Sequence, residues 1–177
     1  MKRFIIIVLL LSVSFIDLFG QGTTTVRLQV VRGARLDFIF NSLSKYKDGI
    51  SYPDFTQLNI YFNDTIDAGI PNPTCAGWEL TLKAVQTEID GDMTAQDLDL
   101  STIEFTVKIE GIATGTTYTL SNASQVIASG VSPAIVDVNK EVLITYNCGT
   151  LPANSLLNKM PDYYYVDLEF NLTKIYL

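Results

Sequence analysis

Large apolar residues alternate with polar ones in many short segments of this chain. Regular segments of this kind cover residues 26–30, 36–40, 58–62, 78–82, 103–109 and 164–172, and shorter strand segments cover 118–120, 125–128 and 134–138. Successive side chains of a strand point to opposite faces of its sheet, so the alternating segments predict half-buried antiparallel strands. Residues 141–146 instead have three apolar residues in succession at 142–144, which fits a central strand covered on both sides. No window of eleven or more residues after position 20 has a convincing helical period. The pattern therefore predicts an all-β protein.

Turn-forming pairs such as Asn-Asp, Asp-Gly and Ser-Gly separate these segments. Many strands at this spacing are typical of a single antiparallel β-sandwich of immunoglobulin-like or Greek-key type. Its core should receive the large residues on one face of the middle and last strands. These expected core residues are Trp78, Leu80, Tyr164, Leu168, Phe170 and Leu172.

The first twenty residues have the composition of a secretory signal peptide. Lys2 and Arg3 precede an apolar run over residues 4–16, and the small residue Gly20 precedes polar Gln21. We expect cleavage after residue 20, which leaves 21–177 as one β-sandwich domain. The mature domain has no apolar run long enough to span a bilayer. The expected location is therefore outside the cytoplasm, in the periplasm, at the cell surface or extracellular.

The charge balance argues against a nucleic-acid partner. Twelve Lys and Arg against 19 Asp and Glu give a net charge of −7. Loss of Lys2, Arg3 and Asp17 with the leader brings it to about −8, which repels a phosphate backbone.

The only cysteines are Cys75 and Cys148. An even number of cysteines in an exported chain is typical of a disulfide, and each cysteine flanks a predicted strand. We therefore expect one disulfide that joins two strand ends.

Two bacterial surface families resemble this pattern. Gly77-Trp78-Glu79-Leu80 in mid-domain and the final Tyr164–Leu172 segment resemble the two motifs of the WxL domain, with Phe170 where that family usually has a second tryptophan. This resemblance covers most of the mature chain on about ten residues, and it implies non-covalent attachment to a cell wall.

The chain is also similar to pilin subunits. The early cysteine, the long alternating last strand and Tyr176, one residue from the C-terminus, carry this similarity. It implies self-association or assembly with other surface subunits. Val26, Leu28 and Val30 would then form an arm that adds to a neighbour's sheet edge, whereas a monomeric binder would pair this segment within its own sandwich.

No catalytic motif is present, and we expect a non-enzymatic protein without a cofactor. The chain has no histidine, which removes Ser-His and Cys-His pairs and histidine metal sites. Glycoside hydrolysis, which needs only two carboxylates, is the enzymatic alternative left open.

Two ligand hypotheses remain beside the structural role. Glu88, Asp90 and Asp92 place oxygen ligands at alternate positions, as a weak calcium site in an adhesin would. Aromatic faces stack on sugar rings, so the tyrosines at 163–165, with Tyr61 and Tyr118, suggest a carbohydrate- or cell-wall-binding module. If Tyr164 points into the core, its two neighbours point outward.

Overall fold

The structure is a computed structural model that describes residues 22–33, 36–67, 70–93, 96–112, 114–131, 138–151 and 155–177. The strands are β1 (Thr23–Arg32), β2 (Leu36–Ile39), β3 (Ile50–Asp67), β4 (Ile70–Pro71), β5 (Cys75–Ala84), β6 (Glu88–Gly91), β7 (Leu98–Asp99), β8 (Ile103–Ile109), β9 (Thr116–Thr119), β10 (Gln125–Val131), β11 (Val138–Cys148), β12 (Tyr163–Val166) and β13 (Leu168–Tyr176). The described residues also include two short helical segments, α2 (Leu43–Asp48) and the 3-10 turn η2 (Leu100–Thr102). The all-β prediction is confirmed.

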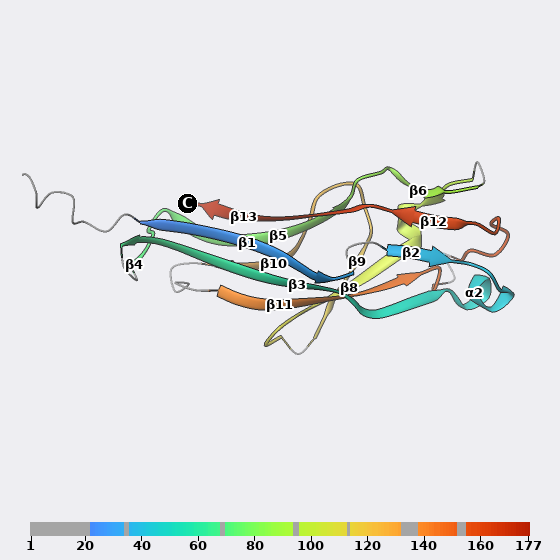
Figure 1. Cartoon of the computed structure of the whole chain (residues 1–177), viewed down its shortest axis with the longest axis horizontal. Coiled ribbons are helices and arrows are strands. Elements are labelled where there is room, and N and C mark those ends of the chain that lie inside the picture. The colour runs from blue at the N-terminus through green and yellow to red at the C-terminus, as the bar shows by residue number, and fades with distance from the viewer. Residues whose placement is uncertain are drawn as a thin grey trace, which may run out of the picture.

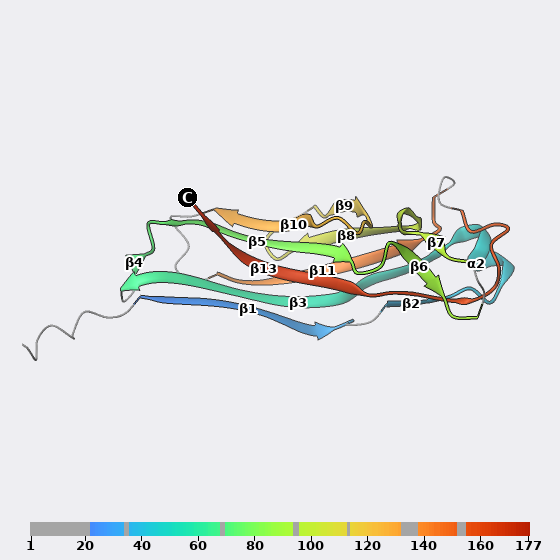
Figure 2. The same ribbon diagram turned by 90° about the horizontal axis from the view of Figure 1, so that it is seen from above.

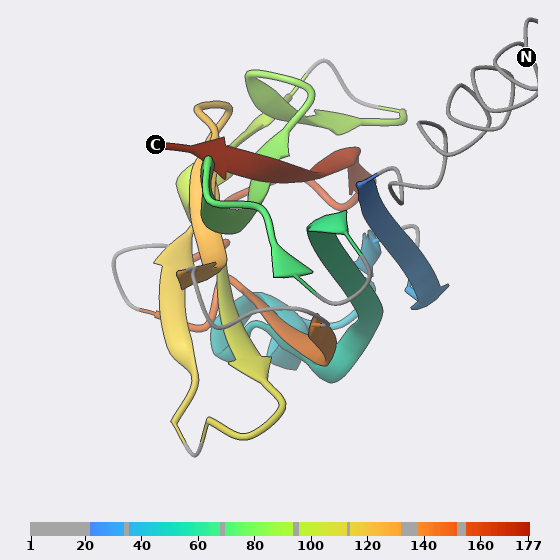
Figure 3. The same ribbon diagram turned by 90° about the vertical axis from the view of Figure 1, so that its left-hand side faces the viewer.

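The strands of the described ranges form three antiparallel sheets. The long sheet has six strands in the order β1-β3-β11-β8-β9, with β4 paired to β3; the short sheet is β10-β5-β13; the distal sheet is β2-β12-β6-β7. Figure 1 shows the strands following one long axis, with the distal sheet and α2 at the end opposite β4. Figures 2 and 3 show the short sheet lying over one face of the long sheet.

The inward-pointing side chains of the alternating strands fill the space between the layers and form one core. On β5, buried residues alternate with half-buried ones from Trp78 to Ala84, and on β11 the same pattern runs from Val142 to Cys148. Trp78, Leu80, Tyr164 and Leu172 lie in this core, and Leu168 and Phe170 pack half-buried against it. Burial of so many apolar side chains is the main favourable term for a fold of this kind.

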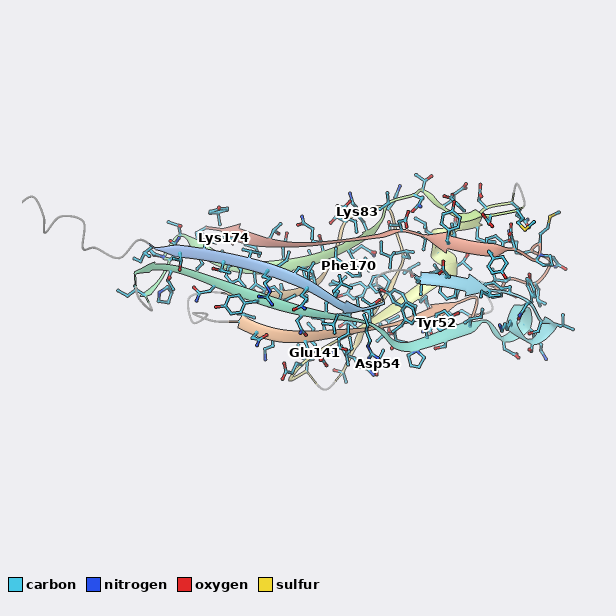
Figure 4. All side chains as sticks on the ribbon, viewed as in Figure 1. Tyr52, Asp54, Lys83, Glu141, Phe170 and Lys174 are labelled. Atoms are coloured by element: carbon cyan, nitrogen blue, oxygen red, sulfur yellow. The ribbon has the colours of Figure 1, made fainter. Side chains whose placement is uncertain are left out.

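Two long segments run along the length of the molecule (Figure 1). The last segment runs as β12 in the distal sheet and, after a single break at Asp167, as β13 in the short sheet. β3 pairs with β11 on both sides of a bulge, where residues 53–55 face Thr145. Pro53 has no amide proton to donate, so a bulge is one of the few places where a strand accepts it. Asp54, at this bulge (Figure 4), has a φ of 46° and its amide donates to Thr145 Oγ1 over 2.9 Å.

The expected disulfide is wrong, because Cys75 and Cys148 are separate, free and buried thiols. Cys75 begins β5 in the short sheet opposite Tyr176, whereas Cys148 ends β11 in the long sheet opposite Ile50 and Ile103. β5 begins and β11 ends toward opposite ends of the long axis (Figure 2). A disulfide needs the two Cα atoms within about 7 Å of each other. Burial raises the pKa of the Cys148 thiol to about 12.

Parts of the sequence prediction lie outside the described residues. The signal peptide lies outside the described residues, as do positions 134–137 of the expected strand at 134–138. α2 was not predicted, because six residues are too few to show a helical period. Within the described ranges, no helix is long and apolar enough to cross a membrane.

Candidate functional site

The arm expected at Val26, Leu28 and Val30 is the edge strand of the long sheet. β1 pairs with β3 in antiparallel register from Thr23 opposite Thr65 onward, with one irregularity near Arg32. Nearly all of its side chains are exposed, and Leu28 is the residue that packs against the core. Among the described strands, β1 pairs only with β3. The arm is therefore attached to its own chain through the backbone rather than through buried apolar surface.

A buried ion pair lies where β1, β3 and β13 meet. Asp64 on β3 is 2% exposed, and Lys174 Nζ on β13 lies 2.5 Å from its Oδ2. Thr24 of β1 donates its hydroxyl to Asp64 Oδ1, also over 2.5 Å. Figure 4 shows Lys174 at the end of β13, near the start of β1. The Asp64 carboxylate thus connects the edge strand to both layers.

The pKa values of this pair follow from burial and mutual attraction. Burial alone would raise the pKa of Asp64, but the hydrogen bond and charge of Lys174 and the hydroxyl of Thr24 stabilise the carboxylate more, so its pKa is lowered. Burial alone would lower the pKa of Lys174, but Asp64 stabilises the ammonium group and raises it. Both groups are therefore held in their charged forms.

A second candidate site lies on the outer face of the distal sheet. Tyr164 is buried, while Tyr163 is 55% exposed and Tyr165 is half-buried, so both neighbours point outward. Tyr165 lies opposite Asp37 of β2 on one side and Asp90 of β6 on the other. A row of three residues, with the tyrosine between two acidic residues, thus runs across the three strands.

This face contains a hollow of about 740 Å³. Its lining includes Tyr163, Tyr165, Ile39 and the acidic residues Asp37, Asp92 and Asp167. A smaller hollow of about 260 Å³ adjoins it, shares Ile39 and Tyr163, and includes the exposed side chain of Met93. Because the two hollows share Ile39 and Tyr163, we refer to them together as the tyrosine groove.

Asp167 is held in place at one edge of the tyrosine groove. Its Oδ2 accepts a hydrogen bond from Gln86 Nε2 over 3.0 Å, and its amide donates to Gln86 Oε1 over 3.0 Å. This reciprocal pair fixes the carboxylate at the break between β12 and β13.

The residues suggested for calcium do not assemble as a group. Glu88 and Asp90 lie on β6, and Asp92 follows it with its amide bonded to Tyr163 O. In the described ranges, no group of three or more His, Cys, Asp or Glu residues could hold a metal ion. Asp90 and Asp92 lie instead near the exposed tyrosines.

Several groups of these sites were not predicted from the sequence. Alternation with buried Leu36 and Phe38 does place Asp37 on an outer face. Its position beside Tyr165 depends on strand register across more than a hundred residues, which no local pattern carries. The pairing of Asp64 with Lys174 was missed for the same reason.

Comparisons with known proteins place the chain in no family. No family model matches it, and no curated protein matches it. Among solved structures it is similar to the CupB6 tip adhesin from Pseudomonas aeruginosa, with a TM-score of 0.39 and 8% identity over 86% of this chain. The match spans 43% of that adhesin chain. At this level of similarity no functional argument rests on the match.

Proposed function

We propose that this chain is a non-enzymatic structural subunit of an exported or cell-surface assembly, in which β1 of one copy pairs with β3 of a neighbour. The observation that supports this proposal is the exposure of β1. The backbone of β1 is paired with β3 along the strand, but its side chains are nearly all exposed. Its contact with the core is made by Leu28. Releasing it would expose little apolar surface, and the edge of β3 would then be open to another strand.

Exchange between copies would restore the contacts that release removes. The pairing of β1 with β3 and the hydrogen bond from Thr24 to Asp64 would form again with the neighbour's β3. Exchange of an identical element is a low-cost route to association for this reason. The remaining cost lies mainly in the connection after Arg32, which begins with Gly33 at a φ of 70°.

The chemistry of the chain supports a non-catalytic role. The sequence has no histidine and no nucleophile motif, so it cannot form the Ser-His or Cys-His pairs of nucleophilic catalysis. A carbohydrate- or cell-wall-binding module is the second candidate function, and the tyrosine groove is the observation that favours it.

Locking β1 onto its own sheet tests the assembly proposal. Gln29 of β1 lies opposite Asn59 of β3, so Gln29→Cys with Asn59→Cys can form a disulfide that prevents exchange. We expect the chain that starts at Gln21 to form oligomers in a concentration-dependent way, measured by light scattering and electron microscopy. The oxidised lock should remain monomeric, and reduction should restore assembly.

A matched lock in the short sheet controls for the disulfide itself. Lys83 and Glu169 lie opposite each other on β5 and β13, away from β1, and Lys83→Cys with Glu169→Cys should assemble like the unmodified chain. Figure 4 shows Lys83 at the side of the molecule opposite Asp54 and Glu141. If the β1 lock assembles as well as this control, or if the unmodified chain is monomeric at every concentration, the proposal is wrong.

A further inference from the structure

The tyrosine groove has the chemistry of a site for extended carbohydrate chains. We propose that it binds a neutral or amine-bearing glycan, with Tyr163 and Tyr165 stacking on sugar rings and the acidic residues accepting hydrogen bonds from hydroxyl or amine groups. The inference rests on the second candidate function and names its class of ligand, and because this site is separate from β1 it can fail without affecting the assembly proposal.

The two tyrosine rings are well placed for a chain-like ligand. They lie on the same face of β12 two residues apart, which puts their Cα atoms roughly 7 Å from each other along the strand. Tyr163 also lies beside Ile39, and the adjoining hollow continues past it to Met93. The apolar surface is therefore a strip rather than a closed pocket, and an elongated ligand can contact both rings.

The polar groups of the groove select the charge of the ligand. Asp37, Asp92 and Asp167 line the larger hollow, and none of the described lining residues is Lys or Arg. Carboxylates accept hydrogen bonds from sugar hydroxyls and attract ammonium groups, but they repel uronates and sulfates. Gln86 holds the Asp167 carboxylate, which reduces the ordering that binding would require.

Pairing of the strands favours a glycan over an extended peptide. Peptides commonly bind sheets by adding a strand to a free edge. β12 lies between β2 and β6 and is paired on both sides, so its edges are already used. A ligand on this face must be recognised by side chains, and the exposed side chains are aromatic rings and carboxylates.

Binding to defined oligosaccharides tests this inference. The β1-locked chain, which keeps assembly out of the measurement, is titrated by calorimetry with cellohexaose, a glucosamine hexamer, a hexauronate and hexalysine. We expect binding of at least one of the first two oligosaccharides and none of the hexauronate. Tyr165→Ala and Tyr163→Ala should each weaken binding roughly tenfold or more, because each removes one stacking surface.

Control variants separate recognition from folding. Tyr176 is 70% exposed on β13, away from the groove, and Tyr176→Ala should leave binding unchanged. Tyr165→Phe keeps the ring and should retain most of the affinity. All variants should unfold at the wild-type temperature. Three outcomes would overturn the inference: binding of hexalysine alone, absence of binding to both uncharged and amine-bearing oligosaccharides, or alanine variants that bind as tightly as the wild type.

Discussion

Trp78 shows how tightly a single side chain is enclosed in this core. It is 4% exposed, and a Cβ atom added at Gly130 would lie 2.4 Å from its Nε1. Truncation of an enclosed indole leaves a cavity, so Trp78→Ala should lower the free energy of unfolding by about 3 to 5 kcal/mol. Denaturant unfolding followed by circular dichroism measures this change. The fluorescence emission of Trp78 in the wild type should be blue-shifted relative to that of free tryptophan.

The strand that faces Trp78 supplies the control. Ser129, next to Gly130 on β10, is exposed, and Ser129→Ala should change the stability by less than about 0.5 kcal/mol. A Trp78→Ala variant that unfolds with the wild type, or emission like that of free tryptophan, would place the indole at the surface.

Asp64 and Lys174 should make stability depend on pH in acid. The pKa of Asp64 is lowered by Lys174 and Thr24, so the stability that it contributes is complete above its ordinary pKa of about 4 and is lost as pH falls through the lower folded value. Asp64→Asn leaves Lys174 without its anion and should cost about 3 to 5 kcal/mol near neutral pH. Unfolding in urea at a series of pH values measures the difference between variant and wild type.

The exposed pair of Lys83 and Glu169 is the matched control for Asp64. The Lys83 and Glu169 side chains are 36% and 51% exposed, far more than the side chain of Asp64, and Lys83 Nζ lies 3.2 Å from Glu169 Oε1. Glu169→Gln should cost no more than about 1 kcal/mol. A wild-type advantage over Asp64→Asn that stays constant down to strong acid would show that Asp64 is not the titrating group.

At the scale of elements, β1 and β11 should differ in protection from hydrogen exchange. β11 is paired on both edges and buries alternate side chains, whereas β1 is paired on one edge and is nearly all exposed. Strands with few buried contacts open locally at low free energy, so β1 amides should exchange well before those of β11. Exchange followed by mass spectrometry measures this. Equal protection of both strands would contradict the easy release on which the assembly proposal depends.

The elements that could be predicted are those with an unbroken period of two. Alternation located most of β5, β8 and β13, because each buries one face. It missed the first half of β3, where Pro53 and Asp54 interrupt the pattern at the bulge. Alternation around Tyr164 also indicated that its neighbours point outward, but the acidic residues beside Tyr165 depend on register between distant segments. The disulfide prediction was wrong because the number of cysteines says nothing about which strand ends meet.

At the scale of the molecule, the long strands should make unfolding cooperative. β3 and β11 pair on both sides of the bulge, and the β12–β13 segment belongs to two sheets. Loss of either end of the sandwich therefore disrupts strands that the other end needs. We expect one thermal transition, with Trp78 emission and far-ultraviolet circular dichroism changing together.

The probes for this test report on different parts of the fold. Trp78 contacts β10 in the short sheet, whereas Tyr52 stacks on Phe38 near the distal sheet, with ring centroids 5.3 Å apart. Near-ultraviolet circular dichroism, to which the tyrosines contribute, should change at the same temperature as the tryptophan signal. Two separated transitions would mean that the distal sheet unfolds independently.

The two buried thiols free this fold from dependence on an oxidant. Neither Cys75 nor Cys148 has a partner sulfur, and their burial raises the pKa of each thiol, which keeps the reactive thiolate scarce. The fold therefore contains no disulfide that an oxidant would have to form. We expect recombinant protein to fold in a reducing bacterial host without an isomerase, with reductant kept in every buffer except those that require an engineered lock.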